Sequence, residues 1–440
     1  MINKIIKTYQ DNSDLIIKKI NSNYSVIYFE SLSSLDKINE YITKPISLNI
    51  SITAPHTLII KPSEINTYLN NGYAITIYKN KLLYASEVKK DLSRSINTPD
   101  SEPAVNGPKD SLTENIETNL GLIKRRIKHQ DLKMINKTIG KYTNTGIKIL
   151  YLDKLIDANI LNNIIQVIDN IDEKEILDSG NLSNILQKQY KCDFPTILLS
   201  ERPDEISNSL VDGKIAIIVD NSPYALLLPS FFIDFINPIT DKYLKPIQNN
   251  FIKLIRYISL IITLVEPAYY IATINYNQET IPTSFLNNFI DQRKGVPFPS
   301  FFEALLMLII YEILRESDTR FPSKYGSTIS ILGALILGEA AVKAGIVSPI
   351  MIITIALSYI ASLVFNDPDF NSEIRIYRFA FLICAALLGL YGIFLCFIFM
   401  LIRLSSAESF SKSYTTPIAP FKINYFKKYI WRNKWEKLFF

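Results

Sequence analysis

The chain has 440 residues, enough for two or three units of ~100–200 residues each. Its net charge of +5 does not indicate nucleic-acid binding, because the segment from Arg403 to Phe440 holds eight Lys or Arg against two Glu, and the remainder sums to −1. With two His and three Cys in the whole chain, there is little material for a His-based metal site or a catalytic triad.

Apolar residues are distributed unevenly along the chain. Residues 1–245 mix Lys, Asn, Ile and Asp at the density of a soluble protein, whereas residues 251–403 are dominated by long apolar runs. Residues 1–20 have no apolar core of the length found in signal sequences, so we expect no export of the first half. The pattern predicts a soluble half followed by a membrane half.

The first predicted unit, residues 1–93, alternates between helix and strand patterns. Helical periodicity occurs around 12–20 and 63–70, and strand-like runs occur at SVIYF (25–29), YAITIY (73–78) and KLLYAS. The stretch that follows, SINTPDSEPAVNGPKD, is rich in Pro, Ser and Asp. We therefore expect a linker over 94–108.

The second predicted unit covers residues 109–245. Ser111 and Glu114 have capping-box spacing and predict the start of a helix that continues through Lys128. Four apolar runs predict strands: IKILYL (147–152), TILLS (196–200), IAIIV (215–219) and YALLL (224–228). Because helical patterns alternate with these runs, both units are expected to be small α/β subdomains.

The membrane half, residues 246–403, contains five apolar windows: 257–274, 298–311, 325–342, 344–365 and 379–402. A spanning helix needs ~20 mostly apolar residues, and the last two windows carry no charge at all. The predicted fold is therefore two small α/β soluble subdomains followed by an all-α multi-span membrane domain.

Charge placement predicts the orientation of this domain. Lys and Arg flank both ends of it, which places both ends in the cytoplasm and requires an even number of crossings. The shortest window is the weakest, so we expect four crossings, with 298–315 lying at the interface or re-entering. A buried short helix packed against the other spans is the alternative. Four crossings place the acidic loop NDPDFNSE (366–373) outside and Lys343 near the inner face.

The tail, residues 404–440, interleaves basic residues with Tyr425, Tyr429, Trp431, Trp435 and Phe439. This composition fits a segment held against anionic membrane lipid. An ordinary positive-inside tail is the alternative.

No catalytic constellation is evident. Cys192, Cys384 and Cys396 lack metal-ligand spacing, and no Gly-rich phosphate loop occurs. The neighbouring carboxylates Asp172 and Glu173 fit a solvated helix end better than an acid and base pair. We expect neither enzyme activity, nor a cofactor, nor a metal.

Several unusual strings occur in a characteristic order. They are GPKDSLTENIETNLGLIKRRIK (107–128), LDSG (177–180), LLSERPDEI (198–206), IVDNSPYALLLPSFFIDF (218–235), KGVPFPSFFEALLM (294–307), GEAAVKAGIVSP (338–349) and PIAPF (417–421). Over about three quarters of the chain this series resembles the GerA family of bacterial spore germination proteins, the A subunits of germinant receptors. The first hundred residues match the family only in general character.

The resemblance implies an integral protein of the endospore inner membrane, with its soluble half and its tail facing the cytoplasm, which in a spore is the core. It implies work with a B subunit similar to amino-acid transporters and with a C lipoprotein. It also implies a homo-oligomeric ring of A subunits around an ion path that opens when nutrients are sensed. A non-conducting membrane scaffold, or a relative of the stage V sporulation AF type, are the alternatives.

One predicted span, 325–342, carries Glu339 and is followed directly by Lys343, and the two faces of this helix differ at 100° per residue. Small residues fall on one face, where they would let a neighbouring helix approach: Gly326, Ser330, Gly333, Ala334 and Ala341. Candidate pore or gate residues fall on the other: Thr328, Leu332, Ile336, Glu339 and Lys343.

Two interpretations of the charged face remain open. It borders the ion path, with Leu332 and Ile336 as an apolar constriction, or Glu339 and Lys343 form a local pair four residues apart. Members of the family often carry Gln and Glu at these two positions, so no ion preference is carried over.

Two further charges lie in apolar windows. Glu266, before Pro267, is either a coupling residue or a polar contact between spans. Glu303 either anchors an interfacial helix or binds an ion.

Overall fold

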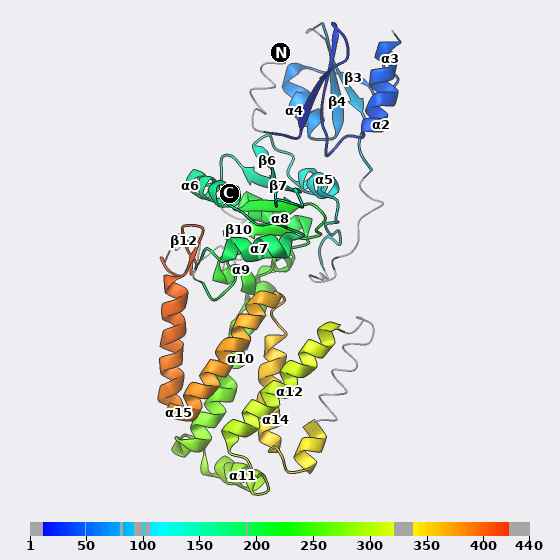
Figure 1. The fold of residues 1–440 in the computed structure, drawn as a ribbon. Coiled ribbons are helices and arrows are strands. Elements are labelled where there is room, and N and C mark those ends of the chain that lie inside the picture. The colour runs from blue at the N-terminus through cyan, green and yellow to red at the C-terminus, as the bar shows by residue number, and fades with distance from the viewer. Residues whose placement is uncertain are drawn as a thin grey trace.

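The computed structural model describes residues 12–48, 50–79, 82–91, 99, 102, 106–190, 192–320 and 338–421. Three parts follow one another along the molecule: a first α/β domain, a second α/β domain and a helical domain (Figure 1). The two predicted α/β subdomains and the helical region after them are therefore confirmed.

The first domain is built on a sheet of five antiparallel strands in the order β1-β2-β4-β5-β3. Successive residues of a strand point to opposite faces, and here both faces are covered. Ile27 packs on the side of α4, and Val26 packs on the side of α2. The elements are β1 (Leu15–Lys19), β2 (Tyr24–Phe29), α2 (Leu35–Ile38), a π-helical turn (Asn39–Thr43), α3 (Lys44–Ser47), β3 (Leu58–Ile59), a 3-10 turn (Pro62–Glu64), α4 (Ile65–Leu69), β4 (Tyr73–Tyr78) and β5 (Leu82–Glu87).

The helix predicted around 12–20 is wrong, because this segment forms β1. It pairs with β2 in the register Leu15 to Phe29, and the pairing satisfies its backbone groups. The strands predicted at 25–29 and 73–78 and the helix predicted around 63–70 are confirmed.

The second domain has a sheet of five antiparallel strands in the order β6-β7-β9-β10-β8. Its two faces hold separate cores: Leu150 faces the side of α5 and α8, while Ile149 faces the side of α6 and α7. The elements are α5 (Ile116–Arg126), β6 (Leu132–Ile139), β7 (Thr145–Leu152), α6 (Ala158–Asp169), α7 (Ser179–Gln187), β8 (Leu198–Ser200), α8 (Pro203–Val211), β9 (Ile215–Val219), β10 (Ala225–Leu228), α9 (Phe232–Ile236) and a 3-10 turn (Ile239–Tyr243).

All four strands predicted in this domain are present, but the predicted helix start is wrong. Helix α5 begins at Ile116, because Asn115 caps it by accepting hydrogen bonds from the N–H groups of Glu117 and Thr118. Ser111 instead donates to a carboxylate oxygen of Glu201 at 3.1 Å. Because its hydroxyl bonds to Glu201, Ser111 does not cap the helix.

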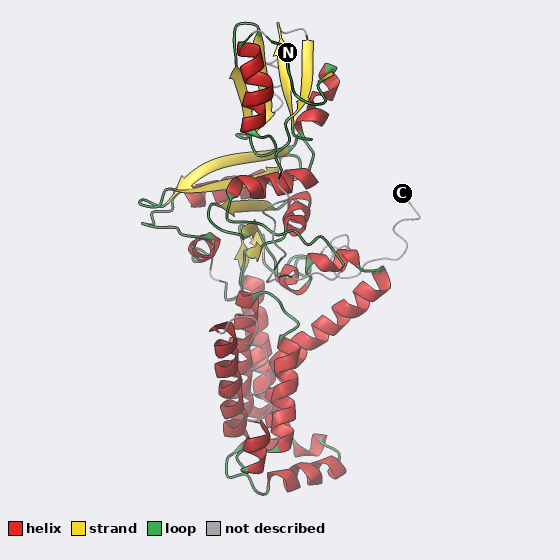
Figure 2. Ribbon diagram, turned by 90° about the vertical axis from the view of Figure 1, so that its right-hand side faces the viewer, coloured by secondary structure: helices red, strands yellow, loops and turns green. Residues whose placement is uncertain are grey.

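The helical domain comprises α10 (Pro246–Asn275), α11 (Thr283–Arg293), α12 (Ser300–Arg320), α14 (Pro349–Ser362) and α15 (Pro368–Ser406) (Figure 2). Among the described residues, α10 and α15 have the length and apolar composition of a membrane-crossing helix, although α15 is interrupted at Gly389. α12 packs along α10 and α14 through buried Ala304 and Leu308. This packing agrees with the alternative of a helix buried against the other spans, and the number of crossings stays a prediction.

Helix α15 doubles back on itself at Gly389, which has φ +62° and ψ −141°. Tyr377, before this residue, and Arg403, after it, both bond to the carboxylate of Asp193, at 2.7 Å and 2.9 Å. A straight helix would hold positions 26 residues apart at a distance of ~39 Å. The uncharged window 379–402 is therefore two antiparallel half-helices and not one span.

This reversal overturns the predicted position of the loop 366–373. Phe370 packs against Phe194, Phe232 and Phe235 of the second α/β domain, so the loop lies on the same side as that domain. The prediction that it lies on the opposite side is wrong, because it treated the window after the loop as a single crossing.

The start of the tail also packs on the second domain. Strands β11 (Glu408–Ser409) and β12 (Lys412–Ser413) form a hairpin whose Phe410 enters the core on the α6 and α7 face. The Tyr414 hydroxyl donates to the carbonyl of Pro195 at 2.8 Å. The start of the tail therefore packs on the second α/β domain. Residues 422–440, which include the five aromatic residues named in the sequence analysis, lie outside the described residues.

Candidate functional site

Most of the predicted pore and packing residues lie outside the described residues. These are Gly326, Thr328, Ser330, Leu332, Gly333, Ala334 and Ile336. Their assignments remain predictions.

Glu339, Ala341 and Lys343 are described, and the two charged side chains differ from Ala341 in their surroundings. The Nζ of Lys343 lies 2.7 Å from the Oε1 of Glu339, with the side chains 74% and 63% exposed. Ala341 is partly buried and packs against the apolar core shared by α10, α12 and α14. The pair therefore points away from the helical core of its own chain.

Glu303 is a buried connector between three helices. Its Oε2 accepts from both the backbone N–H and the hydroxyl of Ser348, at 3.0 Å and 2.9 Å, and Arg293 lies 3.3 Å from its Oε1. Ser348 precedes the first residue of α14, so the carboxylate also meets the positive end of that helix. These contacts tie α12 to α11 and to the start of α14, and the two roles predicted for Glu303 remain predictions.

Glu266 is a residue of α10 whose side chain reaches α14. Its carboxyl group hydrogen-bonds to Thr354 of α14. Its other oxygen is buried with no hydrogen-bond partner in the described part of the chain. The polar contact between helices is thus present, whereas a coupling role remains a prediction.

The sequence analysis missed an ionic cluster between α12 and α15. Glu312 pairs with Arg375 at 2.5 Å and with Arg378 at 2.8 Å, and Arg378 is 1% exposed. Arg378 also reaches the hydroxyl of Ser358 on α14 at 3.5 Å. The three-residue spacing of Arg375 and Arg378, which places both on one helix face, was the available signal.

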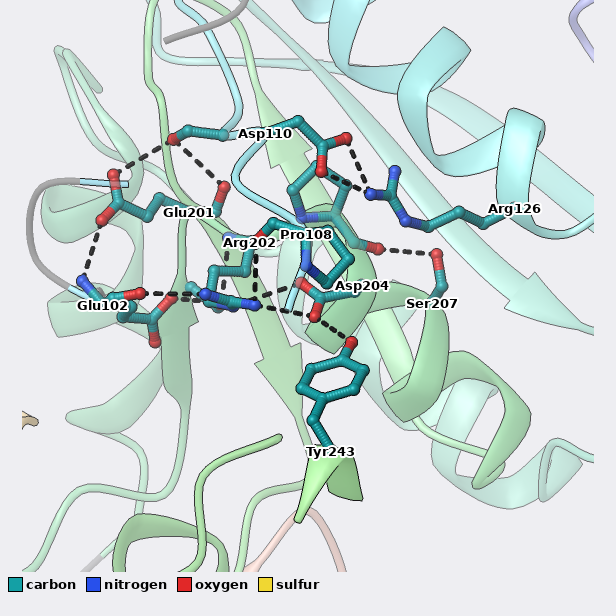
Figure 3. Close-up of polar contacts among 12 residues, drawn as sticks. Glu102, Pro108, Asp110, Arg126, Glu201, Arg202, Asp204, Ser207 and Tyr243 are labelled. Carbon is teal, nitrogen blue, oxygen red and sulfur yellow. Dashed lines mark hydrogen bonds and ion pairs between the residues drawn. The ribbon is translucent and has the colours of Figure 1, made fainter. Parts of the chain in front are cut away.

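A second polar network lies inside the second α/β domain, around Arg202 (Figure 3). Pro203 opens α8, and Arg202 before it has extended backbone angles, as a residue before proline prefers. The guanidinium donates to Asp204 at 2.9 Å and 3.2 Å, and to the carbonyls of Glu102 at 3.0 Å and Pro108 at 3.3 Å. Arg202 is 1% exposed, so this network is a clasp that holds the backbone at Glu102 and at Pro108 close to α8.

Neighbouring residues complete the clasp. The Tyr243 hydroxyl donates to Asp204, and burial, followed by the bond to Asp204, raises the pKa of Tyr243 to about 12. Gly107 fits only because it lacks a side chain, since a Cβ there would lie 2.9 Å from the Tyr243 ring. The strings that begin GPKD and end RPDEI, distant in sequence, thus meet at one place.

The described part of the predicted linker therefore lies on the second domain. Glu102 accepts from Ser200 at 2.8 Å, and its backbone N–H donates to Glu201 at 3.1 Å. Burial, followed by the neighbouring charge of Glu201 and opposed by Ser200 and Arg202, raises the pKa of Glu102 to about 7.

The described residues offer little for catalysis or metal binding. In this part of the chain no group of three or more His, Cys, Asp or Glu could hold a metal ion. The polar and aromatic residues described above instead join parts of the chain. Arg202 acts within the second domain, Phe370 and Asp193 join this domain to α15, and Glu303 and Glu312 join helices of the helical domain.

Comparisons with known proteins agree with the resemblance found in the sequence. Residues 3–439 match the family described as "Bacillus/Clostridium GerA spore germination protein". Spore germination protein KA of Bacillus subtilis is 35% identical over 453 residues, covering 98% of this chain and 83% of the relative. Spore germination protein GerLA of Bacillus cereus is 32% identical over 414 residues, covering 90% and 84%.

A solved structure is also similar. The N-terminal domain of the A subunit of the Bacillus megaterium spore germinant receptor GerK3 aligns at 23% identity with a TM-score of 0.41, covering 53% of this chain and 95% of that one. This likeness is too weak to support an argument about function.

Proposed function

Because the chain belongs to the GerA family of spore germination proteins, we propose that it is the A subunit of a spore germinant receptor. In this proposal the helical domain lies in the inner membrane of the endospore, and both α/β domains face the spore core. Transporter-like B and lipoprotein C subunits are its partners. The subunit has a conducting role and no catalytic one.

The surface of the helical domain supports a membrane location. Large apolar side chains are exposed along the half of α15 that follows Gly389: Tyr391, Phe394, Phe397, Phe399, Leu401 and Ile402. α10 exposes Ile255, Ile258 and Ile261 in the same way. In water such surfaces would be covered by a partner, whereas in a bilayer hydrocarbon covers them.

The Glu339–Lys343 pair is the observation that carries the conducting role. It is exposed on a domain whose other exposed helix surfaces are largely apolar. Charge that faces lipid is costly, so this face requires water or another polar surface. In the proposed ring, Ala341 packs on the helices of its own chain, and the charged face borders the ion path, with Leu332 and Ile336 as its apolar gate.

The test is a charge swap in the receptor complex, Glu339→Lys together with Lys343→Glu. Either arrangement keeps a local pair, so stability should change little, but the relative rates of cation and anion release should change if both groups border the path. The matched control is Asp291→Lys with Lys294→Asp, an exposed pair at 2.6 Å on α11. Ion release is measured from spores after nutrient addition and from reconstituted vesicles.

The outcomes separate the candidate roles. A change of selectivity in the first swap and not in the control supports the conducting role. Unchanged selectivity in both, together with tight gating after Leu332→Ser or Ile336→Ser in assembled complexes, contradicts it and leaves a non-conducting scaffold.

A further inference from the structure

A cavity of about 200 Å³ lies between the second α/β domain and the turn that joins α14 to α15. The domain contributes residues of β8, α8 and α9, and the turn contributes residues 366–369. Leu198, Phe235 and Ile239 give the cavity apolar walls. It adjoins the Arg202 clasp, since Arg202 and Glu102 are shared by both (Figure 3).

The charged groups around the cavity are mostly acidic. Glu102, Glu205, Asp234, Asp367 and Asp369 line it, and Arg202 is the cation among the described lining residues. Arg202 is already committed to Asp204 at 2.9 Å, and Lys214 behind the wall is committed to Asp234 at 2.6 Å. The remaining carboxylates give the cavity an excess of negative charge.

Glu205 distinguishes this cavity from a surface acidic cluster. Its side chain is 8% exposed, lines the cavity and has no hydrogen bond or ion pair among the described residues. Burial, followed by the charges of Glu102 and Asp204, raises its pKa well above the ordinary range of a carboxyl group. Ionising this buried group is costly, and a cation in the cavity would offset that cost.

Size and ligand spacing define the class of cation. In the described part of the chain, no set of three acids is close enough to hold a metal ion. The volume is below the ~300–1,000 Å³ of typical ligand pockets, so the occupant is small. The apolar walls favour an organic group over a hydrated ion.

We propose that this cavity binds a small organic cation with a primary ammonium group, which Glu205 of the domain holds, while Asp367 and Asp369 of the turn add negative charge to the cavity. The ammonium donates to the Glu205 carboxylate, and the alkyl part packs against Phe235 and Ile239. A ligand bound there bridges the second α/β domain and the start of α15. The site does not depend on the proposed receptor function, because binding is measured on the chain alone.

The test uses the full chain purified in detergent and propylammonium chloride as the probe. Saturation-transfer NMR follows the probe's own signals, with sodium chloride added to keep the ionic strength constant. We expect saturable binding to the unaltered chain, and an affinity at least tenfold lower in Glu205→Gln, or about 1.4 kcal/mol. 1-Propanol, which has the same chain without the charge, should not bind.

Two further variants make the test decisive. Asp172→Asn removes an exposed acid elsewhere on the same domain and should leave binding unchanged. Asp369→Asn alters the exposed mouth of the cavity, so it should weaken binding severalfold even if Glu205→Gln fails to fold. Equal binding of propylammonium by all variants, binding of 1-propanol as strong as that of propylammonium, or no saturable binding would overturn the proposal.

Discussion

The two α/β domains have sheets of the same size but are attached to the molecule differently. The first contacts the second mainly through polar groups: Lys124 pairs with Asp14, Ser13 donates to the carbonyl of Met134 at 3.1 Å, and Asn66 donates to Gln130 at 2.7 Å. The second domain meets the helical domain through an aromatic junction around Phe370.

The apolar cores show the same difference. Residues of the second sheet and of α10 and α15, such as Leu150, Leu264 and Phe381, belong to one continuous buried cluster. The first domain has clusters of its own on the two faces of its sheet. Because contiguous apolar cores unfold together, the second domain and the helices should behave as one unit and the first domain as another.

The largest expected effect comes from removing the aromatic junction. Phe370→Ala deletes a fully buried ring, so it should lower the free energy of unfolding of the joined unit by about 3–5 kcal/mol. Differential scanning calorimetry of the detergent-purified chain measures this. Ile75→Ala, which truncates a fully buried side chain in the first domain's own core, should lower only the first domain's transition. If Phe370→Ala shifts the helices and leaves the second domain unaltered, the two are separate units.

A smaller effect is expected at the polar contact between the α/β domains. Lys124 and Asp14 are 5% and 1% exposed, and Asp14 also accepts from the Ser31 hydroxyl at 2.6 Å. Asp14→Asn removes the charge partner of a buried lysine whose pKa burial already lowers, so it should cost about 2–3 kcal/mol.

Amide hydrogen exchange shows which elements lose stability after Asp14→Asn. Exchange should rise in β1 and β2, while α15 stays protected. Asp172→Asn, in an exposed pair with Lys141, should change nothing measurable. Equal loss of protection in β1 and α15 after Asp14→Asn would mean that the domains are one cooperative unit.

The smallest effect is a pH dependence of the joined unit. The folded pKa of Glu102, about 7, lies above its ordinary value of 4.5, and that of Glu205 is raised in the same direction. The native state therefore binds protons more tightly than the unfolded state. The free energy of unfolding should rise as the pH falls from about 7 towards 4.5, and it should fall again as the pH is raised through about 7. From about pH 8 to about pH 6 the Glu102 contribution is on the order of 1 kcal/mol.

Substitution identifies the groups responsible. The double variant Glu102→Gln with Glu205→Gln should flatten the slope of the unfolding midpoint against pH in that window. Asp193, whose pKa is lowered chiefly by its bond with Arg403, titrates below the window and should not contribute. A slope that persists in the double variant would assign the dependence to other groups.

Local patterns predicted strands well and long-range contacts poorly. YAITIY and IAIIV are short apolar runs bounded by polar residues, and both form the strands predicted. β6 was missed although LKMINKTI alternates between buried and more exposed positions, the period that a strand requires. In β1, LIIKK was assigned to a helix, because its pairing with β2 is not a local property.

The sites depended even more on tertiary contacts. The reversal at Gly389 lies in a run of uncharged residues and packs against Tyr276, which follows the last residue of α10 and whose hydroxyl donates to the carbonyl of Ala386 at 2.6 Å. The Arg202 clasp joins strings that were noticed as unusual, but no spacing rule connects positions ~100 residues apart. Glu205 was not singled out, because its importance comes from the cavity that it lines.

The position of the turn between α14 and α15 tests the whole arrangement most directly. Cysteines at Asp172, Asp291 and Asp369, all exposed, are placed singly in a chain whose Cys192, Cys384 and Cys396 are replaced by Ala. Sealed membrane vesicles are then treated with an impermeant maleimide. Asp369 and Asp172 should be labelled from the same face of the membrane and Asp291, on α11 at the far end of the helices, from the other (Figure 1). Labelling of Asp369 and Asp172 from opposite faces would contradict the account.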